Sequence, residues 1–346
     1  MKTKIILFTA FIPTLLSLNS CVQIKQYFKL WNSCDSLTLL MDYVSEVTNE
    51  NSKNFIPVED RIATFDMDGT FIGELYPTYF EYNMLEYRAF DDPTYTDKDE
   101  SVLEAAQAIR NYARYGTKFP DGFDMIHAHA AAKAYAGMSV AEFDTYVKEY
   151  AKKTPVGFTG MTYATSFYKP MLEVFDYLAE YDFTCYVVSG SDRFICRSLV
   201  ESLGIAPNRV IGMDVELKAS NQGDEDGVRY TMQSDEYLIR TDNLLIKNLK
   251  TNKVKQIAQE IGKVPVLSFG NSSGDAAMHN YCMGNQKYRS EVFMLIADDP
   301  DRDYADLEET AKRKAAWDEA GYTVISMKND FKTIYGDGVS KTTIEY

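Results

Sequence analysis

The sequence predicts an α/β protein in which helices cover both faces of a parallel sheet and a helical cap is inserted into the core. Two observations lead to this prediction. Short apolar runs typical of buried strands alternate with amphipathic stretches typical of helices. Polar clusters follow three of these runs directly, and parallel sheets place their functional sites at the carboxyl ends of their strands.

The composition supports a globular protein and restricts its partners. Of the 346 residues, 45% are hydrophobic and 25% are charged, which excludes a disordered or fibrous chain. The 51 acidic residues outnumber the 36 basic ones, for a formal net charge of −15. A surface this acidic repels nucleic-acid backbones, so we expect no nucleic-acid partner. An anionic substrate would need a cation or backbone N–H groups at its site.

Residues 1–20 have the layout of a secretory signal peptide. Lys2 and Lys4 precede an apolar run from Ile5 to Leu18 that is too short to span a bilayer comfortably. The run ends in small residues before Cys21, which resembles the lipobox of bacterial lipoproteins. We therefore expect an exported, periplasmic or cell-envelope protein with a lipid anchor at Cys21. A plain cleaved signal that leaves a free thiol is the alternative.

Residues 21–76 are expected to hold an N-terminal helix and the start of the core. Asp35 and Ser36 can cap a helix that continues through Val44. The run 61–65 is apolar and short, as expected for a buried strand.

Residues 77–165 are expected to form the helical cap. The stretches 101–115 and 139–152 are amphipathic, and Ser139 with Glu142 three residues later matches a capping box. Since this segment lies between the first and second strands, it is predicted to cover the edge of the sheet.

Residues 166–346 are expected to complete the core. Apolar runs predict strands at 184–188, 264–269, 292–296 and 323–327. Amphipathic patterns predict helices at 170–180, 192–203, 252–261 and 303–320. This alternation is what a parallel sheet with helical crossovers requires.

The first strand is followed by two carboxylates. Asp66 and Asp68 are two residues apart, so on a strand they project to the same side. At that spacing they repel each other unless a cation or a shared proton relieves them. Gly69 then permits a tight turn. An ordinary Asx turn is the alternative interpretation.

The later strands end in clusters of oxygen and nitrogen donors. Ser189 and Gly190, directly before a predicted helix, could cradle a phosphate, although a routine helix cap is the alternative. Asn271 and Asp275 lie in a glycine-containing turn and offer the oxygen ligands that Mg²⁺ prefers. Lys253, on the helix before that strand, could reach the acidic site and neutralise it.

Read in chain order, these clusters are D-x-D-G-T, a hydroxyl, a lysine and G-N-x-x-G-D. This order resembles the haloacid dehalogenase (HAD) superfamily of hydrolases, which has a Rossmann-like core, over about residues 61–330. The position of the cap is similar to that in phosphoserine-phosphatase-like members. Members described as true dehalogenases lack an acid at the position of Asp68, so the resemblance implies a phosphatase acting on a small phosphorylated metabolite.

The resemblance also implies roles for individual residues. Asp66 would be the nucleophile that forms an aspartyl-phosphate, and Asp68 would be the general acid and base. Ser189, Gly190 and Lys253 would bind the phosphoryl group.

The resemblance further implies a Mg²⁺ cofactor bound by Asp66, Asp68, Asn271 and Asp275. Many relatives carry Asp where this chain has Asn271, so the sequence leaves open whether Asn271 or Asp275 is the direct ligand.

Two further residues are candidates for substrate specificity, namely Glu74, where the cap begins, and Lys169, where the chain re-enters the core. The predicted function is Mg²⁺-dependent hydrolysis of small phosphomonoesters. A phosphotransferase or phosphomutase on the same scaffold, and a surface binding lipoprotein with a degenerate site, remain as alternatives. The sequence leaves the substrate and the oligomeric state open.

Overall fold

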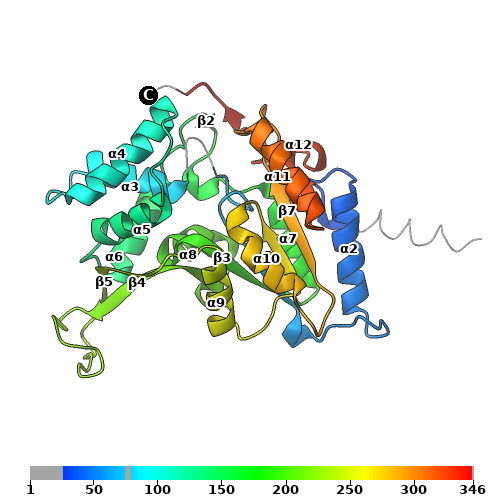
Figure 1. Cartoon of the computed structure of the whole chain (residues 1–346), viewed down its shortest axis with the longest axis horizontal. Helices are drawn as coiled ribbons and strands as arrows, with labels where there is room; N and C mark the ends of the chain where they lie inside the picture. Colours follow the sequence, from blue (N-terminus) through cyan, green and yellow to red (C-terminus); the bar gives the residue numbers. More distant parts are fainter. Residues whose placement is uncertain (1–25, 75–78, 345–346) are drawn as a thin grey trace, which may run out of the picture.

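The computed structural model describes residues 26–74 and 79–344. The core is a seven-stranded sheet in the order β5-β4-β3-β1-β6-β7-β8 (Figure 1). Every neighbouring pair is parallel except β4 and β5. The strands are β1 (Ile62–Phe65), β3 (Thr184–Asp192), β4 (Val210–Ala219), β5 (Leu238–Ile246), β6 (Leu267–Gly270), β7 (Glu291–Ile296) and β8 (Thr323–Ser326). The predicted α/β fold is confirmed.

Helices surround the sheet. All four residues of β1 and of β6 are buried, and because successive side chains point to opposite faces, both faces of the sheet centre are covered. The core helices are α2 (Asp35–Thr48), α7 (Lys169–Glu180), α8 (Arg193–Val200), α9 (Thr251–Glu260), α10 (Ala276–Met283), α11 (Leu307–Glu319) and α12 (Met327–Asp330). A separate antiparallel pair joins β2 (Phe158–Thr159) to β9 (Ser340–Lys341).

Four helices follow β1 and form a group at one end of the molecule (Figure 1). They are α3 (Phe80–Phe90), α4 (Glu100–Tyr115), α5 (Phe123–Ala134) and α6 (Val140–Ala151). The capping box predicted at the start of α6 is present, since Ser139 Oγ accepts from the N–H of Glu142 and the Glu142 carboxylate accepts from the N–H of Ser139. The proposed signal peptide at 1–20, the lipidation site Cys21 and the boundary at 76/77 lie outside the described residues.

The β4–β5 hairpin was not predicted. In β5, one of nine residues is buried, because this strand pairs along one side only and lies at the edge of the sheet. It also joins the cap, since Gly137 donates to the carbonyl of Arg240 at 2.8 Å and Arg240 donates to the carbonyl of Met138 at 2.9 Å. The hairpin therefore fixes the cap segment between α5 and α6 to the edge of the core sheet.

Two global features concern the part of the chain that the structure describes. Within it, no helix is both long enough and apolar enough to cross a membrane. Its cysteines, which are Cys34, Cys185, Cys196 and Cys282, are free thiols.

Candidate active site

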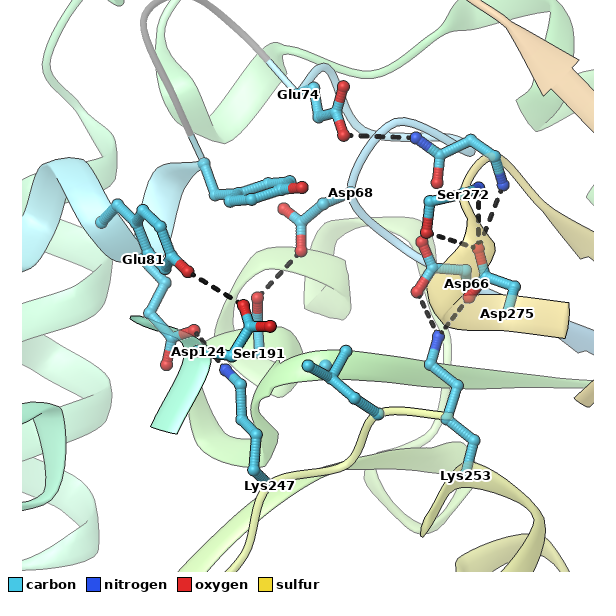
Figure 2. Close-up of a pocket in the computed structure, with 15 residues that line it drawn as sticks. Asp66, Asp68, Glu74, Glu81, Asp124, Ser191, Lys247, Lys253, Ser272 and Asp275 are labelled. Atoms are coloured by element: carbon cyan, nitrogen blue, oxygen red, sulfur yellow. Dashed lines mark hydrogen bonds and ion pairs between the residues drawn. The ribbon is translucent and has the colours of Figure 1, made fainter. Parts of the chain in front are cut away.

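The carboxyl ends of three parallel strands meet at one edge of the sheet. In the sheet, β1 lies between β3 and β6, and Phe65, its last residue, is level with Val187 and Phe269. The segments that follow these positions therefore converge. They line a cavity of about 80 Å³ (Figure 2). The chemistry-bearing turns of the sequence are thus brought to one place.

Lys253 is the electrostatic centre of the core side of this cavity. Its ammonium lies 2.5 Å from Oδ1 of Asp66 and 2.7 Å from Oδ1 of Asp275. It also donates to the carbonyl of Val188 at 2.7 Å, so all three of its protons have acceptors. The side chain is 1% exposed. A buried ammonium is stable here because two carboxylates surround it.

The two carboxylates that share Lys253 differ in protonation tendency. Burial and the charge of Asp275 raise the pKa of Asp66, and Lys253 offsets only part of this effect. Burial also acts to raise the pKa of Asp275, but the ammonium outweighs it and that pKa lies below its usual range. Asp275 Oδ2 further accepts from the backbone N–H groups of Asn271 and Ser272, at 3.2 and 3.1 Å. Asp275 is therefore the fixed anion of the pair.

Asp68 lines the same cavity. Its Oδ2 accepts from the hydroxyl of Ser191 at 2.9 Å. Its Oδ1 is buried and has no hydrogen-bond partner among the described residues. Burial raises the pKa of Asp68, against the lowering effect of the Ser191 hydrogen bond. A carboxyl group with a raised pKa and one uncommitted oxygen is suited to donate a proton to a bound ligand.

Gly69 allows the first motif to approach the last one. Its φ is +77°, in the left-handed region. A Cβ atom at this position would lie 1.9 Å from Nδ2 of Asn271. The Asn271 amide in turn donates to Glu74 at 3.4 Å. The glycine is therefore required for both its conformation and its closeness to the β6 turn.

The family model of haloacid dehalogenase-like hydrolases matches residues 63–279, more than half of the chain. The chain belongs to this family. The prediction of a HAD-like hydrolase is thereby confirmed. No curated protein sequence matches the chain.

Solved structures share the fold of this HAD-like hydrolase at low identity. A conserved protein of unknown function from Anaerococcus prevotii DSM 20548 is 14% identical, with a TM-score of 0.51 over 92% of this chain and 99% of that one. Cytosolic 5'-nucleotidase IIIB bound to cytidine is 12% identical, with a TM-score of 0.46 over 80% and 82%. A phosphoserine phosphohydrolase-like protein from Francisella tularensis is 12% identical, with a TM-score of 0.41 over 77% and 94%.

Most of the residues predicted for the site line the cavity of this HAD-like hydrolase. They are Asp66, Asp68, Glu74, Gly190, Lys253, Asn271 and Asp275. Ser189 does not line it. Because β3 continues to Asp192, Ser189 is wholly buried in that strand, where its hydroxyl accepts from the N–H of Ser191 at 3.0 Å. Lys169 is the first residue of α7 and is also absent from the lining. The roles assigned to Ser189 and Lys169 stay predictions.

The cap and the hairpin contribute residues that the sequence did not single out. Glu81 at the start of α3 lies 3.7 Å from the ammonium of Lys247, and both side chains are buried. Burial raises the pKa of Glu81 to about 7 although Lys247 opposes the shift. Tyr82 and Asp124 also line the cavity from α3 and α5. No spacing signal could have found these residues, because they meet the core only when the cap is in place.

Among the described residues, no group of three His, Cys, Asp or Glu side chains is placed to hold a metal ion. The ligand set that the family resemblance implies includes the Asn271 amide, so it does not depend on such a group. Six acids, Asp66, Asp68, Glu74, Glu81, Asp124 and Asp275, nonetheless line the cavity, against the two lysines Lys247 and Lys253. This excess of negative charge fits a divalent cation.

Proposed function

We propose that this HAD-like hydrolase is a Mg²⁺-dependent phosphatase that hydrolyses small phosphomonoesters through an aspartyl-phosphate. The observation that carries the proposal is one cavity lined both by Asp66, held by Lys253, and by Asp68, one of whose carboxyl oxygens has no hydrogen-bond partner among the described residues. A nucleophile and a proton donor that line the same small cavity match the two requirements of phosphoryl transfer.

The first step transfers the phosphoryl group to the protein. Lys253 holds Oδ1 of Asp66. Oδ2 accepts only a long hydrogen bond among the described residues, from the Thr70 hydroxyl at 3.4 Å, so Oδ2 is the attacking oxygen. The new bond joins this oxygen to phosphorus, while the bond from phosphorus to the leaving oxygen breaks. Asp68 gives its proton to that oxygen, and the alcohol departs.

The second step releases phosphate. Asp68, now ionised, takes a proton from water, whose oxygen attacks phosphorus as the bond to Asp66 breaks. Lys253 balances negative charge on the phosphoryl group in both steps, together with backbone N–H groups at Gly190, near the carboxyl end of β3. The products are an alcohol and inorganic phosphate, and the protein returns to its starting state.

Of the implied ligands Asp66, Asp68, Asn271 and Asp275, three would hold Mg²⁺ directly: the Asp66 carboxylate, the backbone carbonyl of Asp68 and the Asn271 amide. Bound there, the ion would supply positive charge opposite the transferring phosphoryl group. Both oxygens of Asp275 already accept hydrogen bonds, from Lys253 and from the turn that follows β6. For this reason Asn271 is proposed as the direct ligand and Asp275 as the group that fixes Lys253.

Export and lipid anchoring at Cys21 are part of the same proposal, and the motivation is the apolar run that ends at that cysteine. The full chain expressed in a bacterium that processes lipoproteins should partition with membranes. The Cys21→Ala variant should not. Equal partitioning of both proteins would reject the anchor.

The function is tested with protein that lacks residues 1–20 and an aryl phosphate as substrate. Phosphate release should require Mg²⁺, and Asp66→Asn should lower the rate by about 10³-fold or more with an unchanged circular dichroism spectrum. Full activity of Asp66→Asn would reject the assigned nucleophile. Transfer of phosphate to an added sugar without free phosphate would instead show a phosphotransferase. Absence of both Mg²⁺ binding and turnover would indicate a degenerate site.

A further inference from the structure

A second, larger pocket of about 720 Å³ adjoins the reaction cavity. Four residues line both spaces, namely Glu74, Tyr79, Tyr82 and Asp124. The described residues of the larger pocket come from the cap, from the segments on either side of it (Glu74 and Tyr168), from α11 and from the segment before α11. If Asp68 protonates the leaving oxygen, as proposed above, the rest of the leaving group lies in this space. The inference below therefore rests on the proposed function.

Aromatic rings form one wall of the larger pocket. The rings of Tyr112 and Phe119 stack at 4.4 Å between centroids, and those of Phe119 and Phe123 stack at 4.2 Å. Tyr82 meets Phe123 edge to face at 5.6 Å. Aromatic faces carry partial negative charge, so a wall of this kind attracts cations as well as flat apolar groups.

The charge of the lining separates these two possibilities. Five acids line the larger pocket, Glu74, Asp121, Asp124, Asp303 and Asp306, against one base, Arg313. The guanidinium of Arg313 lies 3.0 Å from Glu309, so an acid outside the lining already partners it. An uncharged leaving group would gain nothing from this excess of acids, whereas a cation would be stabilised by it.

An unpartnered oxygen points to where the ligand sits. Asp68 is 8% exposed, and its Oδ1 has no hydrogen-bond partner among the described residues. In Figure 2, Asp68 lies between Glu74 and Ser191, on the side of the cavity toward the cap. Since Glu74 lines both spaces, a molecule hydrogen-bonded to Oδ1 of Asp68 extends toward the acidic, aromatic pocket.

We propose that the larger pocket binds a positively charged leaving group, so that the preferred substrates are phosphomonoesters of amino or quaternary-ammonium alcohols. The aromatic wall of Tyr82, Phe119 and Phe123 contacts the cationic head, and Glu74 and Asp124 supply the charge at the passage between the two spaces. A nucleotide would also stack on the rings, but its neutral base would not offset the negative charge of the acids.

The test compares two esters that differ in charge alone. Phosphocholine carries a quaternary ammonium, and 3,3-dimethylbutyl phosphate has the same shape with carbon in place of nitrogen. With protein that lacks residues 1–20 and with Mg²⁺ present, kcat/KM should be about 10-fold or more higher for phosphocholine. The ratio should fall as salt is added, because salt screens the attraction.

Variants locate the preference in the pocket. Asp124→Asn and Glu74→Gln should each lower the ratio of kcat/KM between the two esters several-fold. The matched control is Glu104→Gln, because Glu104 is an exposed acid of α4 that is not among the residues lining either pocket. That variant should keep the wild-type ratio. Comparing a ratio removes any general effect of a substitution on turnover.

The outcomes separate this inference from the proposed function. Hydrolysis of an aryl phosphate with equal kcat/KM for the two matched esters would overturn the cationic pocket and leave the phosphatase intact. A nucleoside monophosphate that exceeds phosphocholine would overturn it as well. If no ester is turned over, calorimetry with the Asp66→Asn protein still decides, since equal affinity for the two esters overturns the inference and tighter binding of phosphocholine supports it.

Discussion

The two sides of the reaction cavity differ in whether their charged side chains are paired. On the core wall, defined here as Asp66, Lys253 and Asp275, opposite charges lie 2.5 to 2.7 Å apart. On the cap wall, defined as Tyr82 and Asp124, the exposed carboxylate of Asp124 accepts one hydrogen bond from the described residues, that of the Tyr82 hydroxyl at 3.4 Å. One cavity therefore has two different sides. On the core side the charges of the carboxylates are already balanced by Lys253, which fits phosphate chemistry, and on the cap side an acid is available to attract a ligand.

The largest expected effect comes from removing the cation of the core wall. Lys253→Met leaves two buried carboxylates without a counter-ion, and breaking a buried pair in this way costs about 3–5 kcal/mol. Phosphatase activity should also fall by about 10³-fold or more. Urea unfolding and aryl phosphate hydrolysis measure the two effects.

Lys247→Met is the matched control on the cap side. Its ammonium is 3.7 Å from a single carboxylate, that of Glu81, whose pKa is raised to about 7 and which can take up a proton instead. The loss of stability should therefore be smaller than for Lys253→Met. Equal losses for the two variants would remove the distinction between the walls.

The sequence predicted the site best where the reactive side chains directly follow a strand in the chain. Asp66 and Asp68 directly follow an apolar strand, and the parallel register brings them to Asn271 and Asp275 without further information. Lys253 was predicted because its helix directly precedes the strand of the last motif, and the structure places both Lys253 and Lys247 in the cavity lining.

Other parts of the site depend on contacts that are distant in sequence. The edge strand β5 has a mostly exposed pattern, so it lacks the continuous apolar run that identified β1, β3, β6, β7 and β8. Two hydroxyls, Ser189 and Ser191, lie two residues apart in β3. The register of β3 with β4 shifts between Val188 and Asp192, next to both hydroxyls. Ser191 lines the cavity and Ser189 does not, a local detail that spacing does not encode.

Arg240 tests whether the cap wall depends on the unpredicted hairpin. Its guanidinium lies 2.5 Å from Asp192, and the two side chains are 0% and 2% exposed. Arg240→Met should destabilise the fold by about 3 kcal/mol, because it leaves Asp192 buried without its counter-ion. Lys312→Met, in the exposed pair with Glu308, should change stability by less than about 0.5 kcal/mol. Similar unfolding midpoints for the two variants would contradict the prediction that the buried pair stabilises the fold more than the exposed pair does.

Gly69→Ala probes how closely the first and last motifs approach. The substitution adds strain at a φ of +77° and a clash with the Asn271 amide, for a combined cost of about 2–3 kcal/mol. Gly116→Ala is the control, because its φ is +64° but a Cβ there meets nothing within 4 Å, so about 1 kcal/mol is expected. Chemical denaturation measures both. A Gly69 variant no less stable than the Gly116 variant would show that the turn relaxes without cost.

The smallest expected effect concerns Asp92, an acid inside the cap that is buried and accepts several hydrogen bonds. Burial acts to raise the pKa of Asp92, but hydrogen bonds from Thr94, Arg88 and Tyr146 outweigh it and lower the pKa to about 2. A carboxyl group with a depressed folded-state pKa stabilises the fold above its unfolded pKa, near 4, and loses that effect as the pH falls toward 2. Asp92→Asn should thus cost about 2 kcal/mol at pH 7 and progressively less toward pH 2, as measured by urea unfolding across that range. Asp124→Asn, at an exposed position of the cap, should change stability by less than about 0.5 kcal/mol at pH 7. A cost for Asp92→Asn that does not depend on pH would mean that packing, not charge, gives Asp92 its role, and the contrast between the buried and the exposed acid of the cap would then fail.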